Sequence, residues 1–167
     1  MRITLALLGA ALAGAAGTAN AQAAAAATHS ADSAAALKVA VSVFDAMRKR
    51  DTTMARAAFA PDARLTTAAT TRDGAPRVQS EKVDAIVNAL AQPSDSVWDE
   101  RIYKPEVRVD GNLATVWMEY DFYLGSQFSH CGVDAFQLAK YPEGWKIVAL
   151  ADTRRRQGCP DRKAVGR

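Results

Sequence analysis

The stretch VDGNLATVWMEYDFYLG, residues 109–125, predicts a tight turn followed by one long strand of a β-hairpin. Asp, Gly and Asn at positions 110–112 tolerate the positive φ angles that such a turn requires. The segment after the turn is long and rich in aromatic residues, and its apolar and polar side chains alternate, which favours a strand. The same two-residue period recurs over residues 98–109, 131–139 and 145–153. The second half of the chain is therefore predicted to form a meander of four or more antiparallel strands.

Residues 31–50 have the spacing of an amphipathic helix instead. Apolar side chains recur at steps of four, three and three residues, which places them on one side of a helix. They are Leu37, Val41, Phe44 and Met47. A helix with one apolar side must cover another part of the protein.

The segments between this helix and the meander are short. Residues 53–59 are predicted as a second helix and residues 63–67 as a short strand. Residues 70–77 contain Asp-Gly and Pro, which are typical of a loop. A third helix is expected to begin near Ser80 and to stop before Pro93. Helices that precede a run of strands indicate an α+β fold, with the helices packed on one face of a curved sheet.

The first 21 residues have the features of a secretory signal peptide. Arg2 supplies a positive charge, residues 3–16 are almost uninterrupted Leu, Ala, Ile and Gly, and residues 19–21 match a cleavage site. Residues 22–36 follow as an Ala-rich, flexible leader. No later stretch approaches the roughly 20 apolar residues of a transmembrane helix. We therefore expect a secreted or periplasmic protein that makes no membrane contact after cleavage.

The charge distribution argues against a nucleic-acid partner. The formal net charge is +3, which is too small to imply binding to a polyanion. Basic residues crowd the C-terminus, at positions 154–156 and in the tail 160–167. A nucleic-acid or acidic-membrane surface would need interleaved aromatic residues or an amphipathic helix, so a solvated tail is the simpler interpretation.

Four stretches of the chain together resemble a known superfamily, the nuclear transport factor two-like fold. They are VSVFDAMRKRD (41–51), FAPDARL (59–65), the hairpin quoted above, and HCGVDAFQLAKYPEGWKIVALADTRR (130–155). Within that superfamily, the chain is most similar to the SnoaL-like and "putative lumazine-binding" group of small secreted bacterial proteins. The similarity covers residues 37–159, which we take as one domain.

The resemblance implies a cone, in which a curved antiparallel sheet wraps around about three N-terminal helices and encloses an internal apolar pocket. Dimers are common in the superfamily, so we expect a homodimer. Members include isomerases, dehydratases, epoxide hydrolases and polyketide cyclases, and many have no known reaction. Because one fold supports many functions, the resemblance does not fix the activity of this chain.

Strand alternation predicts which side chains enter the pocket. Over residues 130–138 the even-numbered side chains share one face, and apolar Phe136 and Leu138 indicate that this face is internal. Over residues 148–154 the even-numbered side chains again share a face, which includes Leu150.

The turn between these two strands sets their expected register. If it lies at residues 142–144, the numbers of paired residues sum to about 284. Gly132 then lies opposite Asp152, and His130 lies opposite Arg154. The polar ends of both strands collect at one mouth of the cone, and the apolar ends lie near the turn.

His130 beside a carboxylate, with a tyrosine nearby, is a minimal set of groups for moving a proton. Histidine titrates near neutral pH, aspartate orients it or takes the proton, and a tyrosine hydroxyl stabilises an oxyanion. The candidate catalytic residues are His130, Tyr120 and Asp152, with Asp134 as the other carboxylate. The residues expected to contact a ligand are Tyr120, Phe122, His130, Asp134, Asp152 and Arg154. Alternatively, Asp152 pairs with Arg154 or Arg155, and His130 only caps the end of its strand.

The two cysteines have a separate role. Cys131 points away from the pocket in this register, which argues against a cysteine–histidine nucleophile pair. Two cysteines and two histidines, one of them His29 in the leader, lack the spacing of metal ligands, so we expect no metal site. The cysteines are either free thiols or a Cys131–Cys159 disulfide, and export favours the disulfide.

Three functions remain open. The first is binding of a small, largely apolar molecule. The second is cofactor-free acid–base catalysis, such as isomerisation, dehydration or cyclisation, by His130 and a carboxylate. The third is a protein-interaction module with a vestigial pocket. The sequence has no phosphate loop, dinucleotide fingerprint or nucleophile motif, which argues against kinases, dehydrogenases and serine hydrolases, and we expect no cofactor.

Overall fold

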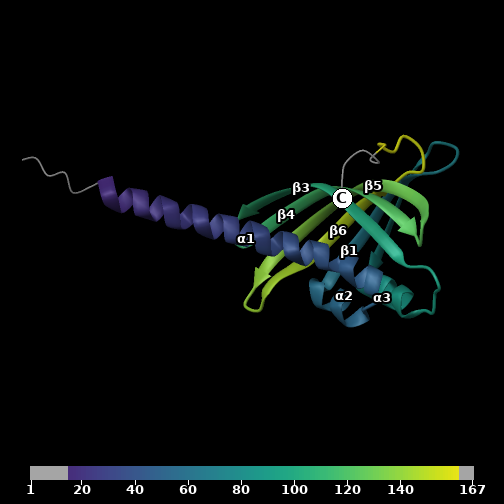
Figure 1. Ribbon diagram of the computed structural model, residues 1–167, viewed down its shortest axis with the longest axis horizontal. Helices are drawn as coiled ribbons and strands as arrows, with labels where there is room; N and C mark the ends of the chain where they lie inside the picture. Colours follow the sequence, from purple (N-terminus) through teal and green to yellow (C-terminus); the bar gives the residue numbers. More distant parts are fainter. Residues whose placement is uncertain (1–14, 162–167) are drawn as a thin grey trace, which may run out of the picture.

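In the described part of the chain, residues 15–161, six strands form one curved sheet and three helices pack against it (Figure 1). This structure is a computed structural model. The strand order across the sheet is β2-β1-β6-β5-β4-β3. The α+β class predicted from the sequence is confirmed. The elements in chain order are α1 (Ala15–Lys49), α2 (Thr52–Ala58), β1 (Phe59–Thr70), β2 (Pro76–Lys82), α3 (Val83–Ala91), β3 (Trp98–Asp110), β4 (Leu113–Leu124), β5 (Gln127–Tyr141) and β6 (Gly144–Arg154).

The predicted meander is present as β3 to β6, and its three strand pairs are all antiparallel. Asp110 pairs with Leu113 across a two-residue turn, in which Gly111 takes the positive φ of 56° that the sequence led us to expect. β1 pairs with β6 in the parallel direction and with β2 in the antiparallel direction. The expected all-antiparallel sheet is thus wrong at one pair, because β1 and β6 are far apart in sequence and no hairpin turn forces them to be antiparallel.

The sheet arches over α1, and α2 and α3 lie on the far side of that helix (Figure 1). The buried side of α1 fills the inside of the arch. The rings of Phe44 from α1 and Phe136 from β5 meet edge to face, with centroids 6.0 Å apart. Other buried residues of this core are Ala36, Ala40, Val43, Met47, Leu138 and Ile147. The helix face predicted from Leu37, Val41, Phe44 and Met47 is therefore only partly the buried face, since Leu37 is partly exposed.

Residues 22–36 were expected to be flexible, but the structure has them within α1. Alanine has the highest helix propensity of all residues, so an Ala-rich segment extends a helix readily. The end of the segment is also held by the sheet. Asp32 accepts hydrogen bonds from Lys140 at 2.7 Å and from the Trp145 indole at 3.3 Å. The signal-peptide prediction remains a prediction, and residues 1–14, like residues 162–167 of the basic tail, lie outside the described residues.

The edge strand β2 was not predicted. The sequence indicated a loop over residues 70–77 and a helix from Ser80, but α3 begins at Val83 with Lys82 as its N-cap. Every residue of β2 is exposed, so its side chains show no alternation of buried and polar positions. Only the backbone pairing with β1 defines this strand, and a hydrophobic pattern cannot report such a pairing.

The register of β5 and β6 differs from the expected one. Asp134, not Gly132, lies opposite Asp152, and Cys131 lies opposite Arg155. One residue of the shift arises at the turn, where Tyr141 pairs with Gly144, and the second arises at Val148, which is left without a partner between the pairs formed by its two neighbours. Such a β-bulge puts one extra residue into one strand and reverses the facing of the residues beyond it.

The bulge also changes which side chains of β6 point inward. Trp145 and Ile147 are buried before it, and Leu150 is buried after it. Val148, predicted to share a face with Leu150, is only partly buried. The predicted pairing of His130 with Arg154 is therefore wrong as well.

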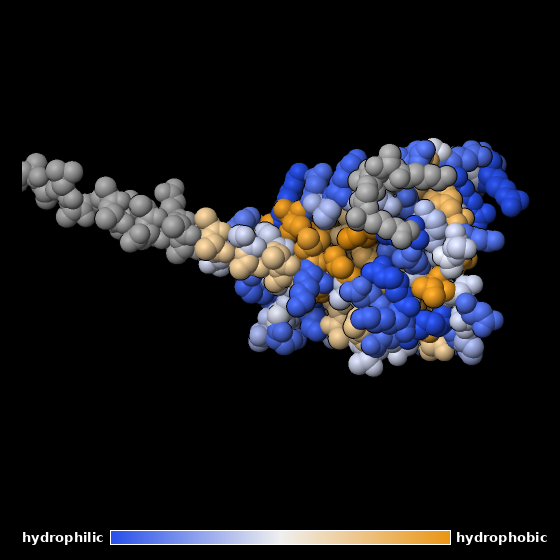
Figure 2. Space-filling model, in the orientation of Figure 1, coloured by the Kyte–Doolittle hydropathy of each residue, from blue (hydrophilic) through white to orange (hydrophobic). Residues whose placement is uncertain are grey.

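The face seen in Figure 2 carries an apolar group of side chains beside α1, where the helix crosses the sheet, surrounded by hydrophilic ones. Leu37 and Val39 of α1 are among the partly buried residues that pack against the core. Among the described residues, no helix combines the length and apolar character needed to cross a membrane.

Candidate functional site

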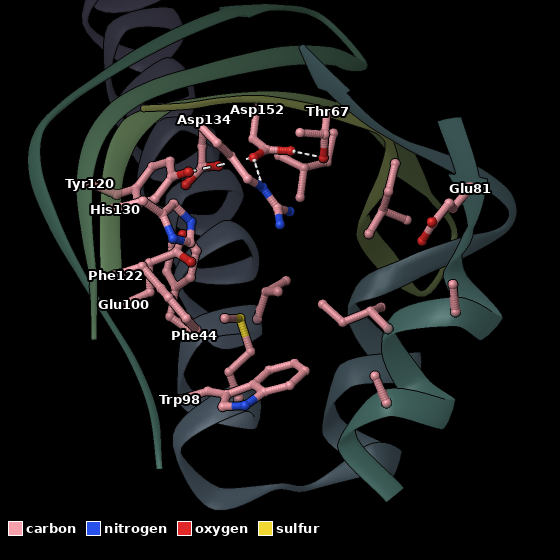
Figure 3. A pocket seen from close by; sticks show the side chains of 18 of the residues that line it. Phe44, Thr67, Glu81, Trp98, Glu100, Tyr120, Phe122, His130, Asp134 and Asp152 are labelled. Atoms are coloured by element: carbon pink, nitrogen blue, oxygen red, sulfur yellow. Dashed lines mark hydrogen bonds and ion pairs between the residues drawn. The ribbon is translucent and has the colours of Figure 1, made fainter. Parts of the chain in front are cut away.

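A cavity of about 410 Å³ lies between the inner face of the sheet, α1 and α3 (Figure 3). Most of its wall is apolar. The apolar side chains come from α1, α3, β3 and β4, and include Val43, Phe44, Met47, Ile86, Trp98 and Phe122. A filled cone, which the interaction-module alternative predicts, is not what the structure shows.

All six residues that the sequence suggested for ligand contact line this cavity. They are Tyr120, Phe122, His130, Asp134, Asp152 and Arg154. The inward faces of β4 and β5 were thus predicted correctly. The roles of these residues in binding or catalysis remain predictions.

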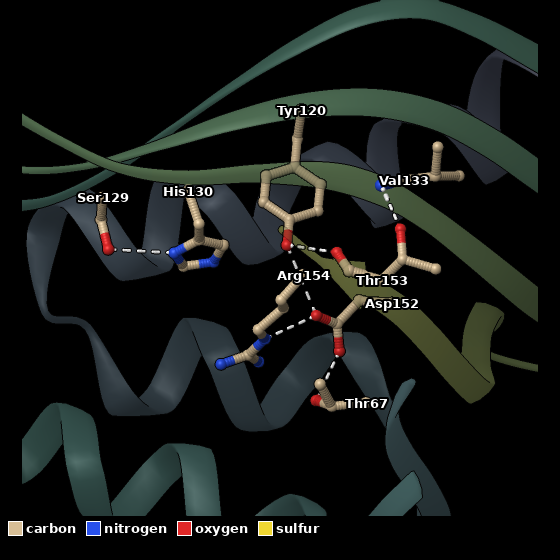
Figure 4. Close-up of polar contacts among 8 residues, drawn as sticks. All are labelled: Thr67, Tyr120, Ser129, His130, Val133, Asp152, Thr153 and Arg154. Atoms are coloured by element: carbon tan, nitrogen blue, oxygen red, sulfur yellow. Dashed lines mark hydrogen bonds and ion pairs between the residues drawn. The ribbon is translucent and has the colours of Figure 1, made fainter. Parts of the chain in front are cut away.

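Asp152 is the centre of a hydrogen-bonded group at one end of the cavity (Figure 4). Its Oδ1 accepts a hydrogen bond of 2.6 Å from Thr67, its pairing partner on β1. Its Oδ2 accepts a bond of 2.6 Å from Arg154 Nε and a longer one, 3.4 Å, from the Tyr120 hydroxyl. Both carboxylate oxygens are engaged, as in the alternative in which Asp152 pairs with Arg154.

Tyr120 reaches this group from β4. Its side chain is buried, and its hydroxyl donates its single proton mainly to the backbone oxygen of Thr153 at 2.8 Å, so the contact with Asp152 at 3.4 Å is the weaker branch of a shared hydrogen bond. Burial, together with the negative charges of Asp152 and Glu100, raises the pKa of the Tyr120 hydroxyl above its ordinary value. The hydroxyl therefore acts as a hydrogen-bond donor and stays protonated at neutral pH.

His130 contacts Ser129 and Phe122. Its Nδ1 is 3.0 Å from the hydroxyl of Ser129, and its ring packs against Phe122 with centroids 4.9 Å apart. Burial and the positive charge of Arg154 lower its pKa to about 4, so the imidazole is neutral at neutral pH. Among the described residues, no hydrogen bond is found between His130 and a carboxylate, which the proposed His130–Asp152 proton relay would require.

A pair of carboxyl groups, Glu100 and Asp134, forms the second polar feature of the cavity. The two side chains hydrogen-bond to each other from β3 and β5. Glu100 keeps some accessible surface, as a cavity-lining residue does, but protein atoms crowd it closely. Asp134 is only 3% exposed. We refer to Glu100 and Asp134 as the carboxyl pair.

The carboxyl pair holds a proton at neutral pH. Burial, opposed in part by the hydrogen bond from Asp134 and reinforced by the charge of Asp152, raises the pKa of Glu100 to about 7. Burial and the charge of Glu100 likewise raise the pKa of Asp134 well above its usual range. Two carboxyl groups in contact cannot both be charged without strong repulsion, so one of them is protonated.

Sequence reasoning missed Glu100. It stands between Trp98 and Ile102 on one face of β3, and both of these neighbours are partly buried against the core. A carboxylate on an otherwise apolar strand face was the available signal, because such a group is buried only when it is paired or protonated.

The predicted disulfide between Cys131 and Cys159 is present in the structure. Cys131 is fully buried, and its backbone exchanges two hydrogen bonds with Arg155. These links fix the end of β6, which carries Asp152 and Arg154, against β5. Within residues 15–161, no cluster of side chains has the composition of a metal site.

Comparison with known proteins identifies the family. The model of the family described as "putative lumazine-binding" matches residues 31–151. The chain belongs to this family. The superfamily resemblance drawn from the sequence is thereby confirmed. No protein with a curated description matches the chain at a significant level.

Solved structures of nuclear transport factor two-like proteins share the fold. One from Novosphingobium aromaticivorans, described as having a cystatin-like fold, is 12% identical, with 83% of this chain and 91% of that chain covered and a TM-score of 0.64. A "putative dehydratase" from Streptomyces avermitilis is 15% identical, with 77% and 99% covered and a TM-score of 0.60. A superfamily protein from Salmonella enterica is 20% identical, with 77% and 91% covered and a TM-score of 0.55. Identities this low establish the fold alone.

Proposed function

We propose that the protein binds a small, largely apolar molecule in the cone cavity. The observation that carries this proposal is the cavity itself, which has about 410 Å³ of space, apolar walls and a few polar groups gathered at one end. Small-molecule sites are typically concave, several hundred Å³ in volume, and mostly apolar with a few convergent polar groups. The family and the fold are compatible with ligand binding or with a cofactor-free enzyme.

The proposal includes the place where the protein acts. A signal peptide over residues 1–21 would direct the chain out of the cytoplasm, to the periplasm or the exterior. The Cys131–Cys159 disulfide supports this, since disulfides persist mainly in oxidising compartments. Mass spectrometry of the protein from its own host tests it, and a mature chain that still begins at Met1 would contradict export.

Binding can be tested by filling the cavity. Ala89 of α3 lines the cavity, whereas Ala91 of the same helix is exposed and does not. In a nuclear magnetic resonance screen with small neutral aromatic compounds, we expect binding to shift the backbone signals of Tyr120 and Phe122. The Ala89→Phe variant should lose these shifts because the new ring occupies the space, and Ala91→Phe should keep them. Equal binding by both variants would place the ligand elsewhere and contradict the proposal.

Acid–base catalysis is the second candidate, and one observation favours it. The pKa of Glu100 is raised to about 7 inside the cavity, and a general acid or base works best with a pKa near the operating pH. This role suits Glu100 better than His130, whose pKa is lowered to about 4. One of the structures with the same fold is described as a "putative dehydratase".

The catalytic candidate makes a different prediction from simple binding. If Glu100 transfers a proton, Glu100→Gln should abolish turnover of a bound neutral compound and leave its binding nearly unchanged. His130→Ala should reduce turnover far less, because a histidine whose pKa is lowered to about 4 is a weak base at neutral pH. If both variants turn over a substrate as fast as the wild type, the catalytic candidate fails and binding remains.

A further inference from the structure

We propose that the ligand of the cone cavity carries a protonated basic nitrogen, which binds at the carboxyl pair formed by Glu100 and Asp134. The inference rests on the proposed function, because it names the chemical class of a molecule bound in the same cavity. It follows from the charges that line the cavity, from one buried oxygen atom and from the aromatic walls.

The charges in the cavity wall are mostly negative. Among the described residues that line it, four are acidic and Arg154 is the one permanently charged base; the acids are Glu81, Glu100, Asp134 and Asp152. Arg154 is paired with Asp152 at 2.6 Å, so its charge is balanced within the wall. Among the described residues no base forms an ion pair with Glu100 or Asp134, although the charges of Arg154 and Arg48 lie near enough to lower the pKa of Glu100 somewhat. With one shared proton the carboxyl pair keeps a negative charge. The cavity wall at the carboxyl pair therefore carries negative charge that no ion pair balances.

A buried oxygen atom of Asp134 also favours a ligand that donates a hydrogen bond. The Oδ2 atom of Asp134 is buried, and apart from the carboxyl group of Glu100 no group among the described residues can donate a hydrogen bond to it. A buried acceptor without a donor costs about 1 to 3 kcal/mol, and more when it is charged. A ligand that brings an N–H donor to Asp134 would remove this cost. A ligand with only acceptors would not.

The apolar walls fit the rest of such a molecule. Phe44, Trp98 and Phe122 line the cavity together with the carboxyl pair, and Glu100 lies beside Phe122 in Figure 3. Aromatic faces attract cations as well as apolar groups. A neutral alcohol would satisfy a hydrogen bond but gain nothing from the negative charge, and a carboxylate would be repelled by it. An apolar body with an ammonium group uses every feature of the site.

Cation binding should also move a proton. A positive charge next to the carboxyl pair stabilises its doubly ionised form, so the shared proton leaves on binding. The other charged and titratable groups that face the pair are Arg48 from α1, Tyr120 from β4, His130 from β5, and Asp152 and Arg154 from β6. Arg48 and Arg154 are permanently charged, and Asp152 is held in its ion pair. The carboxyl pair is therefore the source of the proton.

The test uses three compounds with the same apolar body: 3-phenylpropylamine, 3-phenylpropan-1-ol and 3-phenylpropanoate. Isothermal titration calorimetry at neutral pH measures their affinities for the mature protein. We expect the amine to bind at least about tenfold more tightly than the alcohol, and the carboxylate to bind most weakly. Repeating the amine titration in two buffers with different ionisation enthalpies should reveal proton release, which the alcohol should not cause.

Two variants connect the preference to the carboxyl pair. Glu100→Gln and Asp134→Asn should each reduce the preference for amine over alcohol to less than about threefold, with the alcohol still bound. The proton release should disappear in Glu100→Gln. Glu106→Gln, which changes an exposed glutamate of the same strand as Glu100, should behave like the wild type. Circular dichroism confirms that each variant is folded, and Glu100→Gln alone suffices if Asp134→Asn does not fold.

The outcomes separate this inference from the function on which it rests. If the alcohol binds and the amine binds no more tightly, the ligand class is wrong and the apolar-ligand function stands. If the amine is preferred equally by the wild type and by Glu100→Gln, the carboxyl pair is not its site and the inference is again overturned. If none of the three compounds binds, both proposals fail.

Discussion

The hydroxyl group of Tyr120 donates a hydrogen bond of 2.8 Å to the backbone oxygen of Thr153, two strands away. The bond crosses β5 at Gly132, which is the pairing partner of Tyr120. A Cβ atom on Gly132 would lie 1.8 Å from the Thr153 oxygen and 2.7 Å from Cε1 of the Tyr120 ring. The absence of a side chain on Gly132 is therefore what lets the tyrosine reach β6 and contact Asp152.

Gly132→Ala should strongly destabilise the protein. The new methyl group would meet a backbone oxygen, which cannot rotate away as a flexible side chain could, so β5 and β6 would have to separate. Overpacking of this kind typically costs about 1 to 3 kcal/mol, and we expect the upper end or more. Urea unfolding measures the change.

Gly125→Ala is the matched control for this substitution. The added methyl group at Gly125 meets nothing within 4 Å, and its cost comes from the positive φ of 60° alone. We expect about 1 kcal/mol for that strain. A midpoint for Gly132→Ala equal to that of Gly125→Ala would show that the close approach is relieved without cost.

Local alternation was enough to predict the inward-facing residues of β4 and β5. Tyr120 and Phe122 share a face with apolar neighbours, and so do His130 and Asp134. This works because the two-residue period of a strand holds wherever the strand is regular. The candidate site could be predicted to that extent.

The pairing between strands could not be predicted in the same way. The bulge at Val148 changes the register of β6, and nothing in the local sequence marks it. The exposed strand β2 has no pattern to detect, and Glu100 acquires its importance only when β3 is placed so that it meets Asp134. These features depend on how distant segments pack, which periodicity within one segment does not contain.

Loss of the disulfide should lower the stability of the fold. Cys131 and Cys159 are separated by 28 residues, and the chain-entropy model assigns a loop of this size about 3 to 4 kcal/mol. Cys159→Ala removes the less buried partner and leaves the packing around Cys131 intact. Its urea midpoint should fall to that of the wild type treated with a reducing agent. The reducing agent should not change the urea midpoint of the variant. A further fall would mean that the agent destabilises the protein by a route other than this disulfide.

His130 should remain neutral down to acidic pH. Burial and the charge of Arg154 lower its pKa to about 4 from an ordinary value of 6.5. As the pH falls from 6.5, the imidazole of the unfolded chain is protonated before that of the folded chain. The contribution of His130 to the free energy of unfolding therefore falls as the pH drops from 6.5 to 4. A nuclear magnetic resonance titration of the imidazole signals, assigned with His130→Gln, measures the midpoint. A midpoint near 6.5 would mean that the ring is open to water and available for proton transfer.

Glu100 should make the protein less stable as the pH rises. Its pKa is raised to about 7 in the folded state from an ordinary value of 4.5, so the unfolded state loses the proton first. The free energy of unfolding should therefore fall between pH 4.5 and 7, by about 3 kcal/mol. Glu100→Gln removes this loss, so it should exceed the wild type in stability at pH 8 and match it more closely at pH 4.5, as measured by urea unfolding. Glu106→Gln should follow the wild type at both pH values. If Glu100→Gln also follows the wild type, Glu100 is ionised without penalty, and the carboxyl pair holds no proton for a ligand to displace.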